Sequence, residues 1–296
     1  MSLRDVGGGW QGLLKAIGWS VAFAIVGLVV GLPLVIGAGA LLAGGLDDPN
    51  WFSEPGLPQA LAQGVGLVFG FGIATVVIGR KALRRSWEEL RWQSSAPRGA
   101  WFARGLALGA LAAALAMVLG LGAAGASWAT SEGSWFGWLG AAAGTFGALA
   151  LPALSEELMF RGLPLVLLAG VLGRWPAVVL TAVAFGLSHW SNPDITPLGV
   201  VNISLAGVLL GAAFYAPGGI WTAWGAHLGW NVSLAALGAP VSGLPLGIPF
   251  IEYRPGGPTW VSGGAFGPEG GAMASLAMVA AIGVASRWIS KGESTA

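Results

Sequence analysis

The chain has 296 residues, of which 55% are hydrophobic and only 9% are charged. Soluble globular domains carry about 25% charged residues, so a water-soluble fold could not cover this much apolar surface. We therefore predict that lipid surrounds most of the chain. A net charge of +1 argues against a nucleic-acid partner, because no basic field is present to neutralise phosphates. The absence of cysteine excludes disulfides, thiolate metal sites and a cysteine nucleophile.

Apolar runs of the length that crosses a bilayer, about 20 residues, divide the chain. We predict an all-α polytopic transmembrane helix bundle of about eight helices, at residues 13–44, 58–79, 104–128, 136–169, 174–190, 197–215, 220–238 and 271–290. The first run exceeds the ~7–15-residue core of a signal peptide, so we expect a retained helix. Pro33 and Pro152 are the expected kink points of the first and fourth helices.

No boundary between soluble domains is visible, so residues 1–296 are expected to form a single transmembrane domain. The one long connection, residues 239–270, is rich in Gly and Pro and is expected either to be disordered or to cap the bundle.

Positive charge is concentrated in the connection between the second and third predicted helices. Seven of the 14 lysines and arginines fall there: Arg80, Lys81, Arg84, Arg85, Arg91, Arg98 and Arg104. By the positive-inside rule this connection faces the cytoplasm. With one helix per crossing, both termini are then cytoplasmic, and we expect a multi-pass integral protein of the plasma membrane.

Ionisable residues inside apolar helices are costly, at about 2.5–3.5 kcal/mol each on insertion scales, and they mark functional sites by default. Glu157 and Arg161 are four apart, so they share a helix face and form a structural ion pair. Glu156 points about 100° away and is left without that partner. An unpaired carboxylate in a low-dielectric environment holds a proton more tightly than in water, which suits a general base.

Both histidines of the chain fall in the same region. His189 lies four residues after Phe185, and His227 lies four residues before Asn231. Two antiparallel helices joined near residues 170–174 would place Glu156 and His189 at the same depth, each about 25 Å from the turn. Taken singly, a histidine or Asn231 is also a common hydrogen-bond partner between helices, and Phe185 a common core residue. Their joint placement favours one shared site.

In these residues the chain resembles the CPBP family of intramembrane proteases, which includes type II CAAX prenyl endopeptidases and the bacterial Abi proteins. The family's three motifs match Glu156-Glu157 with Arg161, Phe185 with His189, and His227 with Asn231, in that order. The resemblance covers residues 136–238, which we take as the catalytic core. It implies that Glu156 and His189 activate a water molecule, while His227 and Asn231 donate hydrogen bonds to the developing oxyanion.

Two alternatives concern the chemistry. Ser188, beside His189, is a candidate nucleophile, but adjacent helical residues point about 100° apart, which disfavours it. Zinc held by Glu156, His189 and His227 would form a His₂Glu set. The usual His-Glu-x-x-His zinc signature is missing, so we expect a metal-independent glutamate mechanism.

The expected partners are the lipid bilayer and a membrane-associated peptide substrate, including a prenylated CAAX peptide. Prenylated substrates lie on the cytoplasmic side, whereas the expected topology places the site toward the outer half of the membrane. Either the long fourth helix contains a break, or the substrate is a membrane or exported peptide. The competing functions are a non-catalytic CPBP-type scaffold or bacteriocin self-immunity protein, and a transporter whose Glu/His cluster relays protons.

Overall fold

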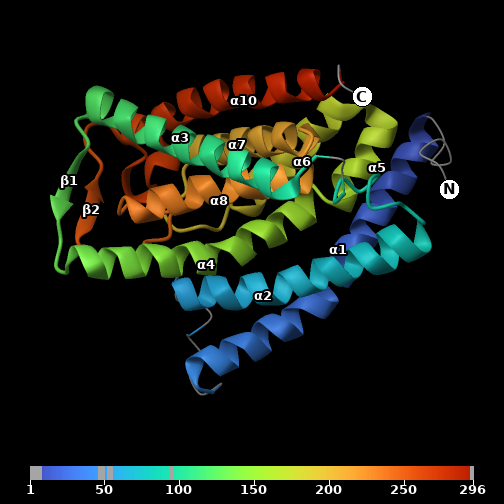
Figure 1. The fold of residues 1–296 in the computed structure, drawn as a ribbon, viewed down its shortest axis with the longest axis horizontal. Coiled ribbons are helices and arrows are strands. Elements are labelled where there is room, and N and C mark those ends of the chain that lie inside the picture. Colours follow the sequence, from blue (N-terminus) through green and yellow to red (C-terminus); the bar gives the residue numbers. More distant parts are fainter. Residues whose placement is uncertain (1–8, 46–50, 52–55, 94–95, 294–296) are drawn as a thin grey trace.

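The computed structural model describes residues 9–45, 51, 56–93 and 96–293, and its architecture is helical (Figure 1). In chain order the main elements are α1 (Gly9–Ala43), α2 (Leu57–Ala74) with its π-helical continuation η2 (Thr75–Ala82), α3 (Arg98–Ala124), β1 (Ser127–Thr130), α4 (Trp135–Phe160), α5 (Leu163–Leu172), α6 (Arg174–Ser188), α7 (Pro197–Tyr215), α8 (Ile220–Ala236), β2 (Ile251–Arg254), α9 (Thr259–Ser262), η3 (Gly264–Phe266), η4 (Pro268–Gly270) and α10 (Ala272–Glu293).

Six helical segments among the described residues are long and apolar enough to cross a membrane. They are Gly9–Ala43, Leu57–Ala82, Arg98–Ala124, Trp135–Leu172, Pro197–Tyr215 and Ala272–Ile289. Two further predicted spans correspond to shorter helices, α6 with 15 residues and α8 with 17. The all-α polytopic bundle is therefore confirmed, while the count of eight transmembrane helices stays a prediction.

The fourth predicted span, residues 136–169, is two helices rather than one. Helix α4 continues through Pro152 and ends at Phe160, and α5 starts at Leu163. A Cβ at Gly162 would overlap the Leu158 carbonyl, so only glycine fits this junction. Pro164 then occupies the first turn of α5, where its missing N–H costs nothing. The simple two-helix hairpin that the sequence suggested is therefore wrong, because α5 interrupts it.

Glycine lets α3 and α8 pack with their backbones in contact. A Cβ at Gly105 or Gly109 would overlap the carbonyl of Thr222 or Ala226. On the facing helix, Gly225 and Gly229 approach the carbonyls of Phe102 and Leu106 in the same way. Helices associate in lipid by close packing of small residues, because lipid tails are as apolar as the side chains and the hydrophobic effect does not drive the association. This contact fixes α8, which carries His227.

Arg91 lies in the connection between η2 and α3 and binds the turn between α7 and α8. Carbonyls at the end of a helix lack partners within that helix. The Arg91 guanidinium donates to three such carbonyls at the end of α7, those of Phe214, Tyr215 and Ala216, at 2.8, 3.0 and 2.9 Å. The Arg91 carbonyl in turn accepts from the Ile220 N–H at 3.1 Å. The connection thus holds the α7–α8 turn by both its side chain and its backbone.

The bundle has two distinct ends. Strands β1 and β2 pair antiparallel, with Trp128 opposite Tyr253, and lie at one end of the bundle (Figure 1). Helix α1 begins and α10 ends at the other end, where the arginine-rich segment after α2 also lies. Residues 1–8 and 294–296 lie outside the described residues. The cytoplasmic orientation of the termini and the plasma-membrane location stay predictions.

Residues 239–270 cap the bundle and carry secondary structure of their own. The segment contains β2, α9, η3 and η4, and Val241 and Leu244 close a tight turn through an isolated antiparallel bridge. Phe266 is fully buried in the core. This segment was expected either to be disordered or to cap the bundle, and in the structure it caps the bundle.

Candidate active site

The two adjacent glutamates of α4 lie in different surroundings. Glu157 is fully buried, whereas the side chain of Glu156 is 30% exposed. This difference follows from the angle of about 100° between consecutive helical side chains. One carboxylate therefore faces the packed interior and the other faces an opening.

Glu157 and Arg161 form the expected ion pair. Glu157 Oε1 lies 3.1 Å from Arg161 Nη1, and both side chains are completely buried. The guanidinium carbon of Arg161 lies 4.2 Å from the ring centre of Phe185, a cation–π distance. Phe185 is 3% exposed and so belongs to the core, as its supporting role requires. The pair is thus enclosed between α4 and α6.

Glu157 has a second partner that spacing along the sequence did not reveal. Its Oε1 lies 2.8 Å from His227 Nδ1, across the contact between α4 and α8. An ionised carboxylate only accepts hydrogen bonds, so Nδ1 carries the proton. A carboxylate behind a functional histidine fixes its tautomer and the orientation of its ring. Glu157 is therefore a positioning group for His227 as well as a partner of Arg161.

His189 follows the last residue of α6 and is held in a similar way. Its Nδ1 lies 2.8 Å from the Phe185 carbonyl, which can only accept, so Nδ1 carries the proton here too. The ring packs against Phe185 with 4.7 Å between ring centres. The His189 backbone N–H donates to the Gly186 carbonyl at 3.2 Å, and the His189 carbonyl accepts from the Asn192 N–H at 3.0 Å, which fixes the following turn.

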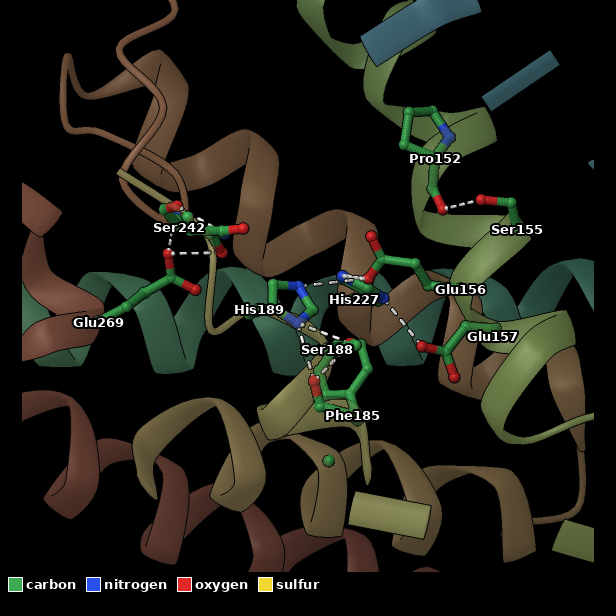
Figure 2. Close-up of polar contacts among 12 residues, drawn as sticks. Pro152, Ser155, Glu156, Glu157, Phe185, Ser188, His189, His227, Ser242 and Glu269 are labelled. Carbon is green, nitrogen blue, oxygen red and sulfur yellow. Dashed lines mark hydrogen bonds and ion pairs between the residues drawn. The ribbon is translucent and has the colours of Figure 1, made fainter. Parts of the chain in front are cut away.

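Three polar atoms converge as a result. Glu156 Oε2 lies 3.9 Å from His189 Nε2 and 3.7 Å from His227 Nε2 (Figure 2). Glu156 Oε2 is buried and has no hydrogen-bond partner among the residues that the structure describes. These separations are too long for direct hydrogen bonds, and polar groups at such distances are commonly bridged by water. Glu156 Oε2 and His189 Nε2 both accept hydrogen bonds, and one water molecule has two protons to donate to them.

Ser188 lies closer to His189 than the sequence argument allowed. Its Oγ is 3.2 Å from His189 Nδ1, a contact that the 100° spacing of adjacent helical residues disfavoured. The Ser188 hydroxyl nevertheless donates to the Phe185 carbonyl at 2.8 Å, and the same carbonyl accepts from Nδ1. A nitrogen that already bears a proton cannot take one from Ser188. The contact does not activate this serine as a nucleophile.

All four predicted catalytic residues line one cavity of about 240 Å³. Glu156 is on α4 and His189 follows the last residue of α6, whereas His227 and Asn231 lie one turn apart on α8. A second, water-sized cavity of about 30 Å³ lies on the inner side of His189, His227 and Asn231. The structure thus brings together the whole set that the sequence singled out, although the assignment of catalytic roles stays a prediction.

A zinc ion would need Glu156, His189 and His227 each within about 2.0–2.2 Å of one point. Among the described residues, no group of three or more His, Cys, Asp or Glu is placed to hold a metal ion. The side chains as arranged do not form such a site.

Three further residues near this cavity carried no signal in the sequence. Ser242 and Asn192 line the cavity itself, and Glu269 lines the inner one. Glu269 is 4% exposed, and burial raises the pKa of its carboxyl against the hydrogen bonds that lower it. These residues lie on the long cap and on the turn after α6, so only the folded chain places them here.

The fold and the site together define a class of protein. It is a polytopic helix bundle in which one partly exposed glutamate faces two histidines. Residues 138–233 match the family model described as Type II CAAX prenyl endopeptidase Rce1-like. The match contains Glu156, His189, His227 and Asn231, and it confirms the resemblance carried by the three motifs. At the level of the family it indicates a membrane protease. No curated protein and no solved structure matches the chain significantly.

Proposed function

We propose that this protein is an intramembrane endopeptidase in which Glu156 activates water for hydrolysis of a peptide bond. The observation that carries the proposal is the convergence of Glu156 Oε2 on the Nε2 atoms of two oriented histidines inside one cavity. A general base must lie within reach of the proton that it removes, directly or through one water. A water between these three atoms meets that condition.

The two histidines have different roles in this proposal. His189 donates its Nδ1 proton to a neutral carbonyl, so its Nε2 lone pair orients the water beside Glu156. His227 donates Nδ1 to the Glu157 carboxylate, a partner that favours a second proton on Nε2. With His227 as an imidazolium, it balances Glu156, as Arg161 balances Glu157, so the four groups carry no net charge. Such pairing offsets the cost of placing charges where they are poorly solvated.

The reaction then proceeds with balanced protons. Glu156 takes a proton from water, and the hydroxide attacks the carbonyl carbon of the substrate. The oxyanion accepts hydrogen bonds from the Asn231 amide and from His227 Nε2–H, and Glu157 holds the His227 ring in place before the charge develops. Glu156 returns the proton to the leaving nitrogen as the C–N bond breaks. A fixed donor of this kind is worth about 10²–10³-fold in rate.

The substrate class proposed is a membrane-associated peptide, with prenylated CAAX peptides as the first to test because of the family match. A non-catalytic scaffold or self-immunity protein has no need of two oriented histidines facing a partly exposed glutamate. A proton-relaying transporter is the third alternative. It predicts proton flux into liposomes that contain the wild type, and no flux when Glu156 is replaced.

The test is hydrolysis of a quenched prenylated CAAX peptide by the purified full-length protein, with and without a chelator. Glu156→Gln keeps size and removes the base, so we expect a loss of about 10²–10⁴-fold in kcat with an unchanged melting temperature. Glu252→Gln, at an exposed carboxylate of β2, is the matched control and retains activity. We expect no effect of the chelator.

Full activity of Glu156→Gln would refute the proposed role of the glutamate. Inactivation by the chelator, reversed by zinc, would refute the metal-independent mechanism. If the wild type leaves the prenylated peptide intact, the same comparison is repeated with membrane-spanning peptides. Failure with both classes, together with proton flux, would favour the transporter.

A further inference from the structure

Glu269 joins three parts of the cap and bundle through a buried carboxylate. Its Oε1 accepts from the Trp230 indole N–H at 2.9 Å, on α8. Its Oε2 accepts from the Ser242 backbone N–H and from the Ser242 hydroxyl, the latter at 3.2 Å. Its backbone carbonyl accepts from Asn202 of α7 at 2.8 Å. Every one of these partners donates, so the site is shaped for a carboxylate.

Ser242 is the centre of the turn Val241–Leu244, and this turn is held from all sides. The Ser242 carbonyl accepts from the Asn192 amide at 2.9 Å, three residues after His189. Val241 and Leu244 exchange two backbone hydrogen bonds at 3.0 and 2.9 Å, and the Gly243 N–H donates to Phe266. All four backbone N–H groups of the turn are therefore bonded, and one of them is bonded to Glu269.

The backbone of the turn is strained where Glu269 holds it. Ser242 has a φ of 51°, a left-handed conformation that costs about 1 kcal/mol or more for a residue other than glycine. Gly243, with a φ of 83°, lies so close to the Pro193 carbonyl that a side chain would overlap it. The turn would not adopt this shape unless its surroundings imposed it. The Glu269 carboxylate supplies two of the contacts that do so.

The turn also forms a wall of the catalytic cavity. Val241, Ser242 and Leu244 line it together with Glu156 and His189. Val241 is buried, whereas Leu244, which also lines the cavity, is partly exposed. In the view of Figure 2, Ser242 and Glu269 lie on the side of His189 opposite Glu156. An apolar wall beside the reacting atoms is suited to holding an aliphatic side chain of a peptide.

We propose that the turn Val241–Leu244 is the element that recognises an apolar substrate side chain next to the scissile bond, and that Glu269 is its positioning residue. The inference rests on the proposed function, because it assigns the substrate-recognition part of the same site. Glu269 does not touch the reacting atoms. It acts through Ser242 on the shape of the wall and through Asn192 on the segment that follows His189.

Kinetics distinguish this role from a merely structural one. A variant that only unfolds more easily leaves fewer active molecules, which lowers the apparent kcat and leaves KM unchanged. A displaced recognition wall weakens binding, which raises KM in the molecules that remain folded. In Glu269→Gln the amide N–H₂ of glutamine faces a donor, either Ser242 N–H or Trp230 N–H, so one hydrogen bond is replaced by repulsion.

The experiment uses the full-length protein and quenched prenylated peptides whose first residue after the cysteine is Ala, Val or Leu. We expect Glu269→Gln to raise KM about 10-fold for the Leu peptide with kcat within about twofold. Glu252→Gln, the same change at an exposed position of the same loop, leaves both constants unchanged. Leu244→Ala enlarges the space beside the turn, and we expect it to shift kcat/KM by about 10-fold toward the peptide with the larger side chain.

Hydrogen–deuterium exchange of residues 241–244 gives a readout that needs no substrate. We expect faster exchange in Glu269→Gln and unchanged exchange in Glu252→Gln. Unchanged exchange, or an unchanged KM with lower kcat, overturns the positioning role of Glu269. An unaltered substrate preference of Leu244→Ala overturns the recognition role of the turn. If the wild type cleaves no peptide while Glu156→Gln is also inert, the proposed function and the recognition role fail together, and exchange alone decides whether Glu269 holds the turn.

Discussion

Replacing Glu157 with alanine leaves the guanidinium of Arg161 buried without its carboxylate. Both side chains are completely buried and 3.1 Å apart, and within the described part of the chain Arg161 Nε already has no hydrogen-bond partner. Removing one member of a buried pair costs about 3–5 kcal/mol, because the remaining charge cannot be solvated. His227 Nδ1 also loses its acceptor, which adds about 1–3 kcal/mol. We therefore expect Glu157→Ala to lose at least about 3 kcal/mol of unfolding free energy.

The assay is reversible unfolding in mixed micelles, followed by the fluorescence of the 16 tryptophans. Glu156→Ala is the matched control, because that side chain is 30% exposed and is not part of the buried pair. We expect it to change the unfolding free energy by less than about 1 kcal/mol. The double variant Glu157→Ala/Arg161→Met should recover most of the loss, since no unpaired charge remains. Equal stability of Glu157→Ala and Glu156→Ala would refute this division of roles.

Two further predictions concern packing and pH. Gly109→Ala places a Cβ against the Ala226 carbonyl and should destabilise the protein by about 1–3 kcal/mol or more, whereas Gly122→Ala on the same helix meets no atom within 4 Å and should be neutral in a thermal melt. Burial raises the pKa of Tyr253 above 10.0, so the folded protein keeps a proton that the unfolded chain loses. Unfolding free energy should then fall as the pH rises through and above 10.0, and Tyr253→Phe should flatten this decline. A decline of equal steepness in Tyr253→Phe would contradict that assignment.

Local chemistry made part of the site predictable. Glu157 and Arg161 are one helical turn apart, so their pairing needs no knowledge of the fold. The different surroundings of Glu156 follow from the same periodicity, and the structure has one glutamate buried and the other partly exposed. The three motifs also located the region that the family match covers, residues 138–233.

Other expectations failed where they assumed regular geometry. Continuous hydropathy gave the fourth span as one run with an expected kink at Pro152, but the helix continues through Pro152, and the break lies at Gly162 between α4 and α5. The separation of Ser188 from His189 assumed that the helix continued, but α6 ends at Ser188 and the two side chains meet at 3.2 Å. Breaks of one or two residues decide such contacts, and hydrophobic periodicity averages over them.

Composition and helical spacing by themselves determined that the chain is an all-α membrane protein and that its ionisable residues lie in one region. They did so because burial in lipid and side-chain direction are properties of local sequence. Only the tertiary structure decided that Glu157 orients His227, since the two lie 70 residues apart and meet where α4 packs on α8. The same holds for Glu269 and the turn Val241–Leu244, whose hydrogen bonds join the cap to α7, α8 and the segment after α6. Contacts between distant elements depend on how the helices pack, and the spacing of residues along one helix carries no information about that.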